Sequence, residues 1–313
     1  MMKFAFLFPG QGSQSVGMMV GFGDNPVIKQ TFVEASDILG VDFWAMATEP
    51  NDLLNLTQHT QPLMLTAGVA TARAYVEAGG AKPSILAGHS LGEYSALVAA
   101  CALTFADALP LVKYRAEVMQ SAVPEDVGAM AAILGLDDEV VRAVCLEAAQ
   151  NEVLEAVNYN SPGQVVIAGH KVAVERGMAL AKEKGAKRAL PLPVSVPSHC
   201  ALMKPAAEKL KTYLASVSVN PPQIPVLHNA DVASYHDAVQ IKDALVRQLY
   251  SPVRWVKTIQ KIAADGIDQA AECGPGKVLT GLNKRIVAEM SCIAITSLGS
   301  LNEAKTILGE HHA

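Results

Sequence analysis

Short apolar runs alternate along the chain with longer stretches in which apolar residues recur at the spacing of one helix face. The short runs predict buried strands at residues 3–8, 84–87 and 267–272. The longer stretches predict helices at residues 61–78, 104–119, 201–216 and 278–290. Because strands that alternate with helices form parallel sheets covered on both faces, we expect a doubly wound α/β fold.

The middle of the chain departs from this alternation. Its predicted elements follow the order strand, helix, strand, strand, helix, strand, at residues 128–134, 137–149, 154–158, 164–168, 172–184 and 187–192. This is the order of a ferredoxin-like βαββαβ unit. We therefore expect a large α/β domain at residues 1–125 and 194–313, interrupted by a small inserted domain at residues 126–193. The Pro-rich stretch 191–197 would form the return hinge.

Composition limits the environment and the partners. Of the 313 residues, 50% are apolar and 18% are charged, so the chain can bury a large core and is not intrinsically disordered. A net charge of −5 argues against a nucleic-acid-binding surface. No apolar run has the length of a membrane span, the first apolar stretch is too short for a signal peptide, and the 5 cysteines form no close pair. We expect a cytoplasmic monomer.

The strongest chemical signal is the sequence Gly-His-Ser-Leu-Gly at residues 88–92. An apolar strand precedes it and a helix-compatible run follows it, which is the context of a G-x-S-x-G nucleophile elbow. Glycines flank the serine because it occupies a strained turn between strand and helix. The pattern predicts that Ser90 is a nucleophile, with free N–H groups of the following helix facing a developing oxyanion.

A loop of sequence Phe-Pro-Gly-Gln-Gly-Ser-Gln, residues 8–14, follows the first predicted strand. It would lie at the carboxyl ends of the strands, where open α/β sheets bind ligands. Neither this loop nor Gly-Pro-Gly-Lys at 274–277 has the glycine spacing of a dinucleotide or phosphate loop. The sequence also contains no metal-ligand spacing such as H-E-x-x-H. We therefore expect no metal and no cofactor.

A nucleophilic serine needs a base, and the sequence offers several histidines: His59, His89, His170, His199, His228, His236 and the terminal His311 and His312. His199 lies between an extended Pro-Ser segment and a predicted helix, a position near the functional edge of the sheet. The nearest preceding acid, Glu183, falls within a helix of the inserted unit. A backbone carbonyl could orient the imidazole instead.

Arg115 lies on an apolar predicted helix, 25 residues after Ser90. Charged side chains are rarely buried without a partner. Two interpretations remain open from the sequence: a surface pair with Glu117 or Asp107, or a guanidinium that faces a substrate carboxylate.

Together these segments resemble the malonyl-CoA:acyl-carrier-protein transacylases of bacterial fatty-acid synthesis, over essentially the whole chain. The matching segments are residues 8–14, 88–96, Arg115, 160–164, 197–199, Gln248 and 274–279. The resemblance implies a hydrolase-like parallel-sheet domain. It also implies transfer of malonyl from malonyl-CoA to the thiol of acyl carrier protein through a seryl ester, which supplies fatty-acid elongation.

The resemblance further implies roles for individual residues. Ser90 would carry the malonyl ester, and His199 would act first as base and then as acid. The main-chain carbonyl of Gln248 would orient His199, so on this view Gln248→Ala should cost little.

The remaining implied roles concern substrate and partner. Arg115 would hold the malonyl carboxylate, and the backbone N–H groups of Gln11 and Leu91 would form the oxyanion hole. In related modular acyltransferases a leucine after the nucleophile tends to accompany malonyl. Acyl carrier proteins are acidic, so docking requires a local basic surface. The candidates are Lys182, Lys184, Lys187 and Arg188 in the inserted unit, with Lys284 and Arg285 near the C-terminus.

Two alternatives remain. A patatin-like serine acyl hydrolase also uses G-x-S-x-G after a strand, with an Asp-Gly partner for which only Asp265-Gly266 is available. A non-enzymatic docking module would have lost the catalytic side chains, which the presence of Ser90, His199 and Arg115 disfavours.

Overall fold

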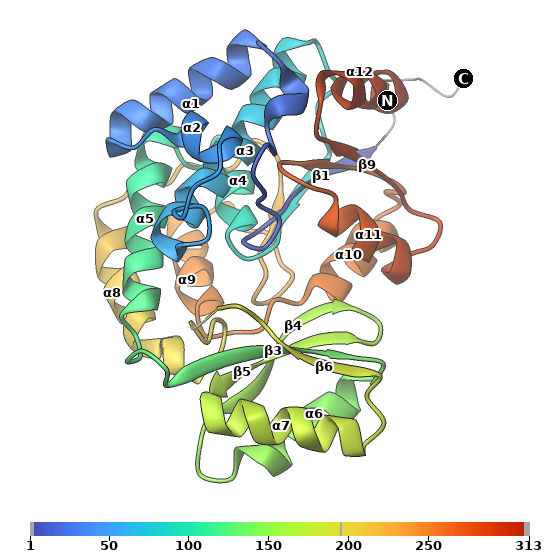
Figure 1. The fold of residues 1–313 in the computed structure, drawn as a ribbon. Helices are drawn as coiled ribbons and strands as arrows, with labels where there is room; N and C mark the ends of the chain where they lie inside the picture. The colour runs from blue at the N-terminus through green and yellow to red at the C-terminus, as the bar shows by residue number, and fades with distance from the viewer. Residues whose placement is uncertain (1–2, 195, 310–313) are drawn as a thin grey trace.

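The structure is a computed structural model that describes residues 3–194 and 196–309. It contains a 5-stranded parallel sheet and a separate 4-stranded antiparallel sheet below it in the view of Figure 1. The predicted fold class, an α/β parallel-sheet unit with a ferredoxin-like unit inserted in it, is confirmed. One residue of the predicted return hinge, Ser195, lies outside the described residues.

The parallel sheet has the strand order β7-β2-β1-β8-β9. All four neighbouring pairs are parallel. Its strands are β1 (Phe4–Phe8), β2 (Ile85–Gly88), β7 (Val226–Leu227), β8 (Gln269–Cys273) and β9 (Ser291–Ile295). Because the strands are parallel, the loops that follow them meet at one edge of the sheet.

Strand β1 explains how the sheet is covered on both faces. Its side chains alternate: Phe4, Phe6 and Phe8 belong to one apolar core, whereas Ala5 and Leu7 belong to another on the opposite face. Such burial on both sides is typical of parallel sheets. The first core contains α3 (Thr57–Glu77), α4 (Gly92–Ala99), α5 (Phe105–Gln120) and α8 (Lys204–Ala215), and the second α10 (Trp255–Ala264) and α11 (Val278–Ile286).

Other elements were not predicted. They are the helices α1 (Pro26–Leu39), α2 (Phe43–Thr48), α9 (Ala238–Gln248) and α12 (Leu298–Gly309), the short turn of 3-10 helix η1 (Val20–Phe22), and the strands β7 and β9. The helix predicted over residues 201–216 begins with a short 3-10 turn, η2 (Ala201–Met203), before α8. The helix predicted over residues 278–290 is wrong beyond Ile286, because Val287 is already extended and the chain turns there into β9.

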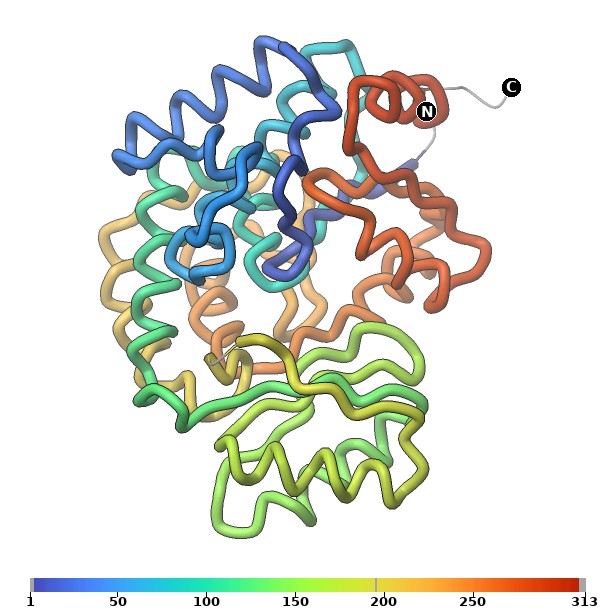
Figure 2. Tube along the Cα trace, in the orientation of Figure 1, coloured from blue at the N-terminus to red at the C-terminus, as the bar shows by residue number. Residues whose placement is uncertain are grey.

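The inserted unit runs from β3 to β6 and forms one contiguous lobe, green to yellow in Figure 2. Its elements are β3 (Gly128–Leu134), α6 (Asp138–Ala149), β4 (Leu154–Ser161), β5 (Gln164–His170), α7 (Lys171–Glu183) and β6 (Arg188–Pro191). The antiparallel order is β4-β5-β3-β6. The domain limits at 125/126 and 193/194 remain a prediction.

The two faces of the antiparallel sheet have different neighbours. On β5, Val165 and Ile167 pack with α6 and α7, whereas Val166 and Ala168 belong to a small cluster with Cys200. The second face therefore packs directly beside His199. Val253 strengthens the junction: its N–H donates to the Val157 carbonyl at 2.8 Å, and its carbonyl accepts from the Tyr159 N–H at 3.0 Å.

Candidate active site

Ser90 occupies the turn between β2 and α4 with a φ of 51°. This left-handed conformation is unusual for a residue other than glycine. The flanking glycines are needed because of close backbone approaches. A Cβ on Gly88 would lie 1.9 Å from the Gly92 carbonyl carbon, and a Cβ on Gly92 would lie 2.0 Å from the Phe8 carbonyl oxygen. The predicted elbow is thus present, with its serine half-exposed at the carboxyl edge of the sheet.

Of the candidate histidines, His199 is the one that the structure places against the serine. The distance between Ser90 Oγ and His199 Nε2 is 2.8 Å, and that between His199 Nδ1 and the Gln248 main-chain oxygen is also 2.8 Å. A carbonyl oxygen can only accept, so Nδ1 carries the proton. This tautomer leaves Nε2 free to accept the hydroxyl proton of Ser90, and no carboxylate is needed to orient the ring.

The surroundings keep His199 neutral. Burial, and to a smaller extent the positive charge of Arg115, together lower the pKa of the imidazole to about 3, although the hydrogen bond to the Gln248 carbonyl acts in the opposite direction. A neutral imidazole at physiological pH is ready to accept a proton. The site can therefore activate a hydroxyl without first losing a proton to solvent.

Asn229 fixes the elbow from the loop after β7. Its Oδ1 accepts from the Ser90 N–H at 2.7 Å, and its Nδ2 donates to the Gly88 carbonyl at 2.7 Å. These bonds satisfy two backbone groups of the strained turn. The sequence analysis missed this residue. Its one signal was a polar pair, His228-Asn229, directly after an apolar stretch.

The predicted oxyanion donors lie in the loops after β1 and β2. Leu91 immediately precedes the first residue of α4, and Gln11 lies three residues after the end of β1. Within residues 3–194 and 196–309, neither backbone N–H donates to another protein group. Both groups are thus free to bind an oxyanion at the N-terminal end of a helix, where the helix dipole favours negative charge.

Arg115 comes from α5 and is 1% exposed. Its guanidinium donates to Gln61 Oε1 at 2.7 Å, to Gln248 Oε1 at 2.9 Å and to Ser90 Oγ at 3.2 Å. Among the described residues no carboxylate forms an ion pair with it, and its Nε has no partner. The surface-pair interpretation is wrong, since Arg115 is buried and bound by neutral acceptors. Burial lowers its pKa, yet a guanidinium stays charged in proteins.

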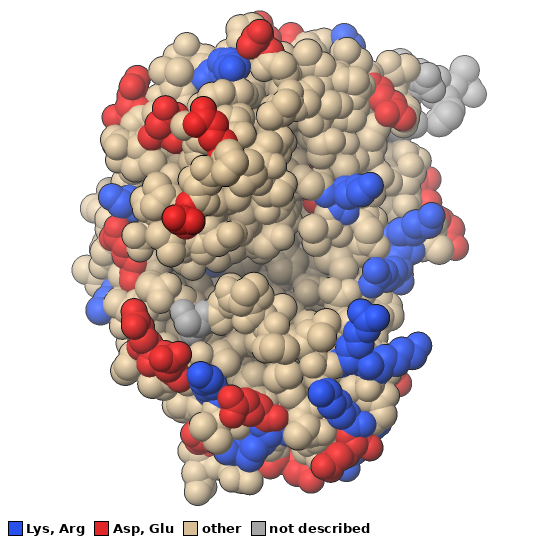
Figure 3. Space-filling model, viewed as in Figure 1, with Lys and Arg blue, Asp and Glu red and all other residues tan. Residues whose placement is uncertain are grey.

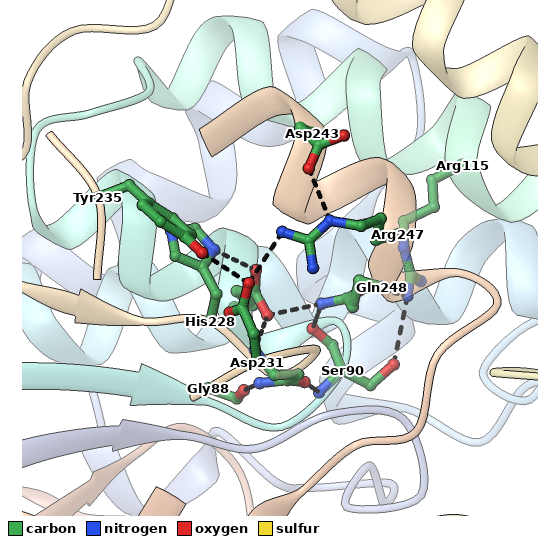
Figure 4. Close-up of polar contacts among 11 residues, drawn as sticks. Gly88, Ser90, Arg115, His228, Asp231, Tyr235, Asp243, Arg247 and Gln248 are labelled. Carbon is green, nitrogen blue, oxygen red and sulfur yellow. Dashed lines mark hydrogen bonds and ion pairs between the residues drawn. The ribbon is translucent and has the colours of Figure 1, made fainter. Parts of the chain in front are cut away.

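The side chain of Gln248 also takes part in the site (Figure 4). Its Nε2 donates to the Ser90 carbonyl at 3.0 Å and to Glu93 Oε2 at 2.9 Å, while its Oε1 accepts from Arg115. Glu93 in turn accepts from His228 Nδ1 at 2.6 Å and from the Asn229 N–H at 2.9 Å. The expectation that only the Gln248 backbone matters therefore leaves out part of its contacts. Sequence analysis also missed Gln61 and the roles of Glu93 and His228.

The other histidines lie elsewhere or have other partners. His170 Nδ1 accepts from the Val153 N–H at 2.9 Å, and His228 is buried against Glu93. His89 Nε2 lies 2.8 Å from Asn160 Oδ1 of β4, so the inserted unit contributes to the wall of the site. His59 lies in α3, and His236 lies in the loop before α9. His311 and His312 lie outside the described residues.

Asp265, the candidate acid of a patatin-like hydrolase, lies between α10 and β8. It is therefore at the amino end of β8, opposite the edge that carries Ser90. Its carboxylate instead pairs with Lys261 at 2.5 Å. Asp265 is therefore not placed to serve as the acid partner of Ser90 in a hydrolase.

The site lies where the parallel sheet meets the inserted unit, and Figure 3 shows the surface hollowed between these two parts. A separate cavity of about 850 Å³ lies between the ends of α3 and α4 and contains none of the predicted site residues. No helix of the described residues is long and apolar enough to cross a bilayer.

Comparison with known proteins agrees with this geometry. Residues 5–306 match the acyl transferase domain family. The chain is 56% identical over 308 residues to the malonyl CoA-acyl carrier protein transacylase of Salmonella typhimurium, covering 98% of this chain and 100% of that protein.

Two solved structures are similar throughout. The acyl-carrier-protein S-malonyltransferase of Burkholderia pseudomallei 1710b has a TM-score of 0.96 and 59% identity, covering 97% of this chain and 100% of that one. A malonyl transacylase solved in complex with its type II PKS acyl carrier protein has a TM-score of 0.96 and 53% identity, covering 97% and 99%.

Proposed function

The chain belongs to the acyl transferase family, and we propose that it transfers the malonyl group of malonyl-CoA to the thiol of acyl carrier protein for fatty-acid synthesis. The observation that carries this proposal is the combination of an activated serine with a buried, unpaired cation. Ser90 Oγ lies 2.8 Å from His199 Nε2, and the Arg115 guanidinium donates to the same oxygen at 3.2 Å. Such a site suits an acyl group that carries a second, negatively charged end.

In the first half-reaction the Ser90 oxygen attacks the thioester carbonyl of malonyl-CoA while its proton passes to His199 Nε2. The carbonyl oxygen becomes an oxyanion held by the N–H groups of Gln11 and Leu91. When the C–S bond breaks, the CoA sulfur leaves and takes the proton from His199. Ser90 then carries the malonyl ester, whose carboxylate pairs with Arg115.

The second half-reaction runs in the opposite sense. The thiol of acyl carrier protein gives its proton to His199, and the sulfur attacks the ester carbonyl. The same two N–H groups bind the oxyanion, and the Ser90 oxygen leaves with the proton from His199. The products are malonyl-acyl carrier protein and the free enzyme. Both thiols use one site in turn, so the kinetics should be ping-pong.

Docking of acyl carrier protein needs a positive surface on this net negative chain. Figure 3 shows Lys and Arg side chains along one side of the face, over α11 and β6. Arg285 of α11 donates to Gln164 at 3.0 Å, Gln164 pairs with Leu134, and Leu134 pairs with Arg188. Two strand spacings therefore separate Gln164 from Arg188, or about 10 Å.

We name this surface the basic ridge and define it as Lys187, Arg188, Lys284 and Arg285, all exposed. It is continuous across the junction beside the site, and we propose it as the docking surface. Lys182 and Lys184 lie on or directly after α7, which covers the opposite face of the small sheet. Lys184 also has a partner, since its Nζ lies 3.8 Å from Glu147. These two lysines are therefore poorer candidates than the ridge.

We further propose a monomer, because one chain supplies every side chain named in the site. We also propose that the protein acts in the cytoplasm. The function is tested by mixing the protein with malonyl-CoA or acetyl-CoA and measuring its intact mass. The proposal requires one malonyl group on Ser90, which acyl carrier protein then removes. Hydrolysis without transfer to acyl carrier protein would contradict it.

A further inference from the structure

Two buried charges lie close together in the site without forming an ion pair. Arg115 is 1% exposed and Glu93 is 0% exposed. They come from α5 and α4, and among the described residues neither forms a salt bridge with the other. In a medium of low polarity, opposite charges at such positions attract strongly. Something must therefore satisfy each of them separately.

The Gln248 side chain connects the two charges. Its Oε1 accepts from Arg115 at 2.9 Å, and its Nε2 donates to Glu93 Oε2 at 2.9 Å. Only this orientation of the amide suits both neighbours, since the opposite one would point an NH₂ group at the guanidinium. Figure 4 shows Gln248, the last residue of α9, beside Ser90 and Arg115.

Apart from Gln248, each of the two charged side chains has hydrogen-bond partners that do not remove its charge. Glu93 receives His228 Nδ1 at 2.6 Å and the Asn229 N–H at 2.9 Å, in addition to Gln248. Arg115 has the neutral acceptors Gln61, Gln248 and Ser90. Consequently Glu93 is stabilised by donors, whereas Arg115 has no negative partner of its own.

We propose that Gln248 is a positioning residue for substrate selectivity, whose side-chain amide is a neutral spacer that keeps the Arg115 guanidinium from pairing with the Glu93 carboxylate. This rests on the proposed role of Arg115 in binding the malonyl carboxylate. A guanidinium already paired with a carboxylate would have to give up that partner before it bound malonyl. Because the Gln248 amide is neutral, the malonyl carboxylate meets an Arg115 guanidinium that is not already paired with another carboxylate.

The direct test exchanges the two side chains, Glu93→Gln with Gln248→Glu. The exchange keeps volume and net charge but moves the carboxylate onto Arg115. We expect the ratio of kcat/KM for malonyl-CoA over acetyl-CoA to fall by about ten- to a hundredfold, the range of a hydrogen bond to a charged group. The loss should appear mainly as a higher KM for malonyl-CoA. A ratio within about threefold of that of the original protein, or a parallel fall in kcat/KM for both substrates, would overturn the spacer role of Gln248.

A second set of variants decides the question if the exchanged protein does not fold, as judged by its thermal melting. Gln248→Met removes the amide and lets Arg115 approach Glu93, so the malonyl-to-acetyl ratio should fall. Adding Glu93→Gln removes the competing carboxylate and should restore the ratio at least in part. If Gln248 has a purely structural role, the effects of Gln248→Met and Glu93→Gln on the malonyl-to-acetyl ratio should add. A double variant whose ratio does not recover would therefore refute the spacer role of Gln248.

Gln61→Met provides the matched control. It removes the other amide acceptor of Arg115, which lies 2.7 Å away but forms no hydrogen bond with Glu93 among the described residues. Adding Glu93→Gln to this variant should give no recovery, and equal recovery in both backgrounds would contradict the spacer.

Arg115→Ala separates this idea from the proposed function. If that variant loses malonyl and acetyl loading in parallel, the proposed role of Arg115 fails, and the spacer fails with it. If it loses malonyl selectively while the exchanged protein keeps its selectivity, the spacer alone fails.

Discussion

Arg115→Ala tests the central claim about selectivity. Malonyl differs from acetyl by one carboxylate, and the guanidinium that would meet it is 1% exposed. Without Arg115 the carboxylate would be taken from water into a buried site that offers no cation in its place. The penalty should therefore affect malonyl far more than acetyl.

The magnitude follows from the contacts. An arginine can make two parallel hydrogen bonds to a carboxylate, each worth about 1.5–3 kcal/mol when a group is charged. Their loss should cost about 2–5 kcal/mol, the range measured for truncating one member of a buried charge pair. This corresponds to about a 30- to 5,000-fold lower kcat/KM for malonyl-CoA. Acetyl loading should fall far less, because acetyl loses only the single, longer bond from Arg115 to Ser90 Oγ at 3.2 Å.

The assay is kcat/KM for loading of both thioesters, followed by intact mass. Arg247→Ala is the matched control, because Arg247 directly precedes Gln248 but already pairs with Asp231 at 2.9 Å and Asp243 at 2.6 Å. Arg247→Ala should change kcat/KM for malonyl-CoA and acetyl-CoA in parallel, if it changes them at all. Arg115→Lys should rescue poorly, since one ammonium cannot copy the planar fork. Parallel losses for malonyl and acetyl in Arg115→Ala would refute the reasoning.

Four further predictions follow from the same geometry. Ser90→Ala should abolish acyl loading while the melting temperature stays close to that of the original protein, and any loaded species in its mass spectrum would contradict the nucleophile. Because burial lowers the pKa of His199 to about 3, kcat/KM should show no acid limb near pH 6.5, and stability should fall as the pH drops below 6.5 towards 3, where only the unfolded chain gains the proton. Asn229→Ala should destabilise the fold by about 2–6 kcal/mol in urea titrations, because it leaves two backbone groups of the elbow unpaired at about 1–3 kcal/mol each, and an unchanged unfolding midpoint would contradict this role. Reversing Lys187 and Arg188 to Glu should raise KM for acyl carrier protein but not for malonyl-CoA, and equal effects on both would remove the docking role.

Local sequence was enough to predict the parts of the fold that carry strong periodicity. The order of the inserted unit was readable because β3 and β5 are short apolar runs, whereas α6 and α7 are longer and mix charged with apolar residues. The Pro162-Gly163 turn also separates β4 from β5. Strand β7 has only two residues and adds to the sheet through neighbours far along the chain, so no local pattern could reveal it. Such elements exist because tertiary contacts stabilise them.

The candidate site likewise contains one part that the sequence predicts and another that it does not. The elbow around Ser90 is specified by glycines within a few residues, so its sequence predicts its shape. Gln61, Glu93 and Asn229 are polar residues whose use depends on partners 54 to 155 positions away. Without those partners, sequence shows only an amide in an apolar helix or an acid beside a glycine. Their roles become visible only when the loops after β1, β2 and β7 meet at one edge.

The meeting of those loops also explains how one site can combine a weak base with a strong cation. His199 and Arg115 are both buried and both contact Ser90 Oγ. Burial, together with the nearby positive charge, keeps the imidazole neutral in the resting site, which preserves it as a base. When a malonyl carboxylate pairs with Arg115, that positive charge is compensated, and an imidazolium beside it becomes less unfavourable. The substrate's own charge would thus assist the proton transfer that loads it, an effect acetyl cannot provide. Selectivity and rate then arise from the same guanidinium.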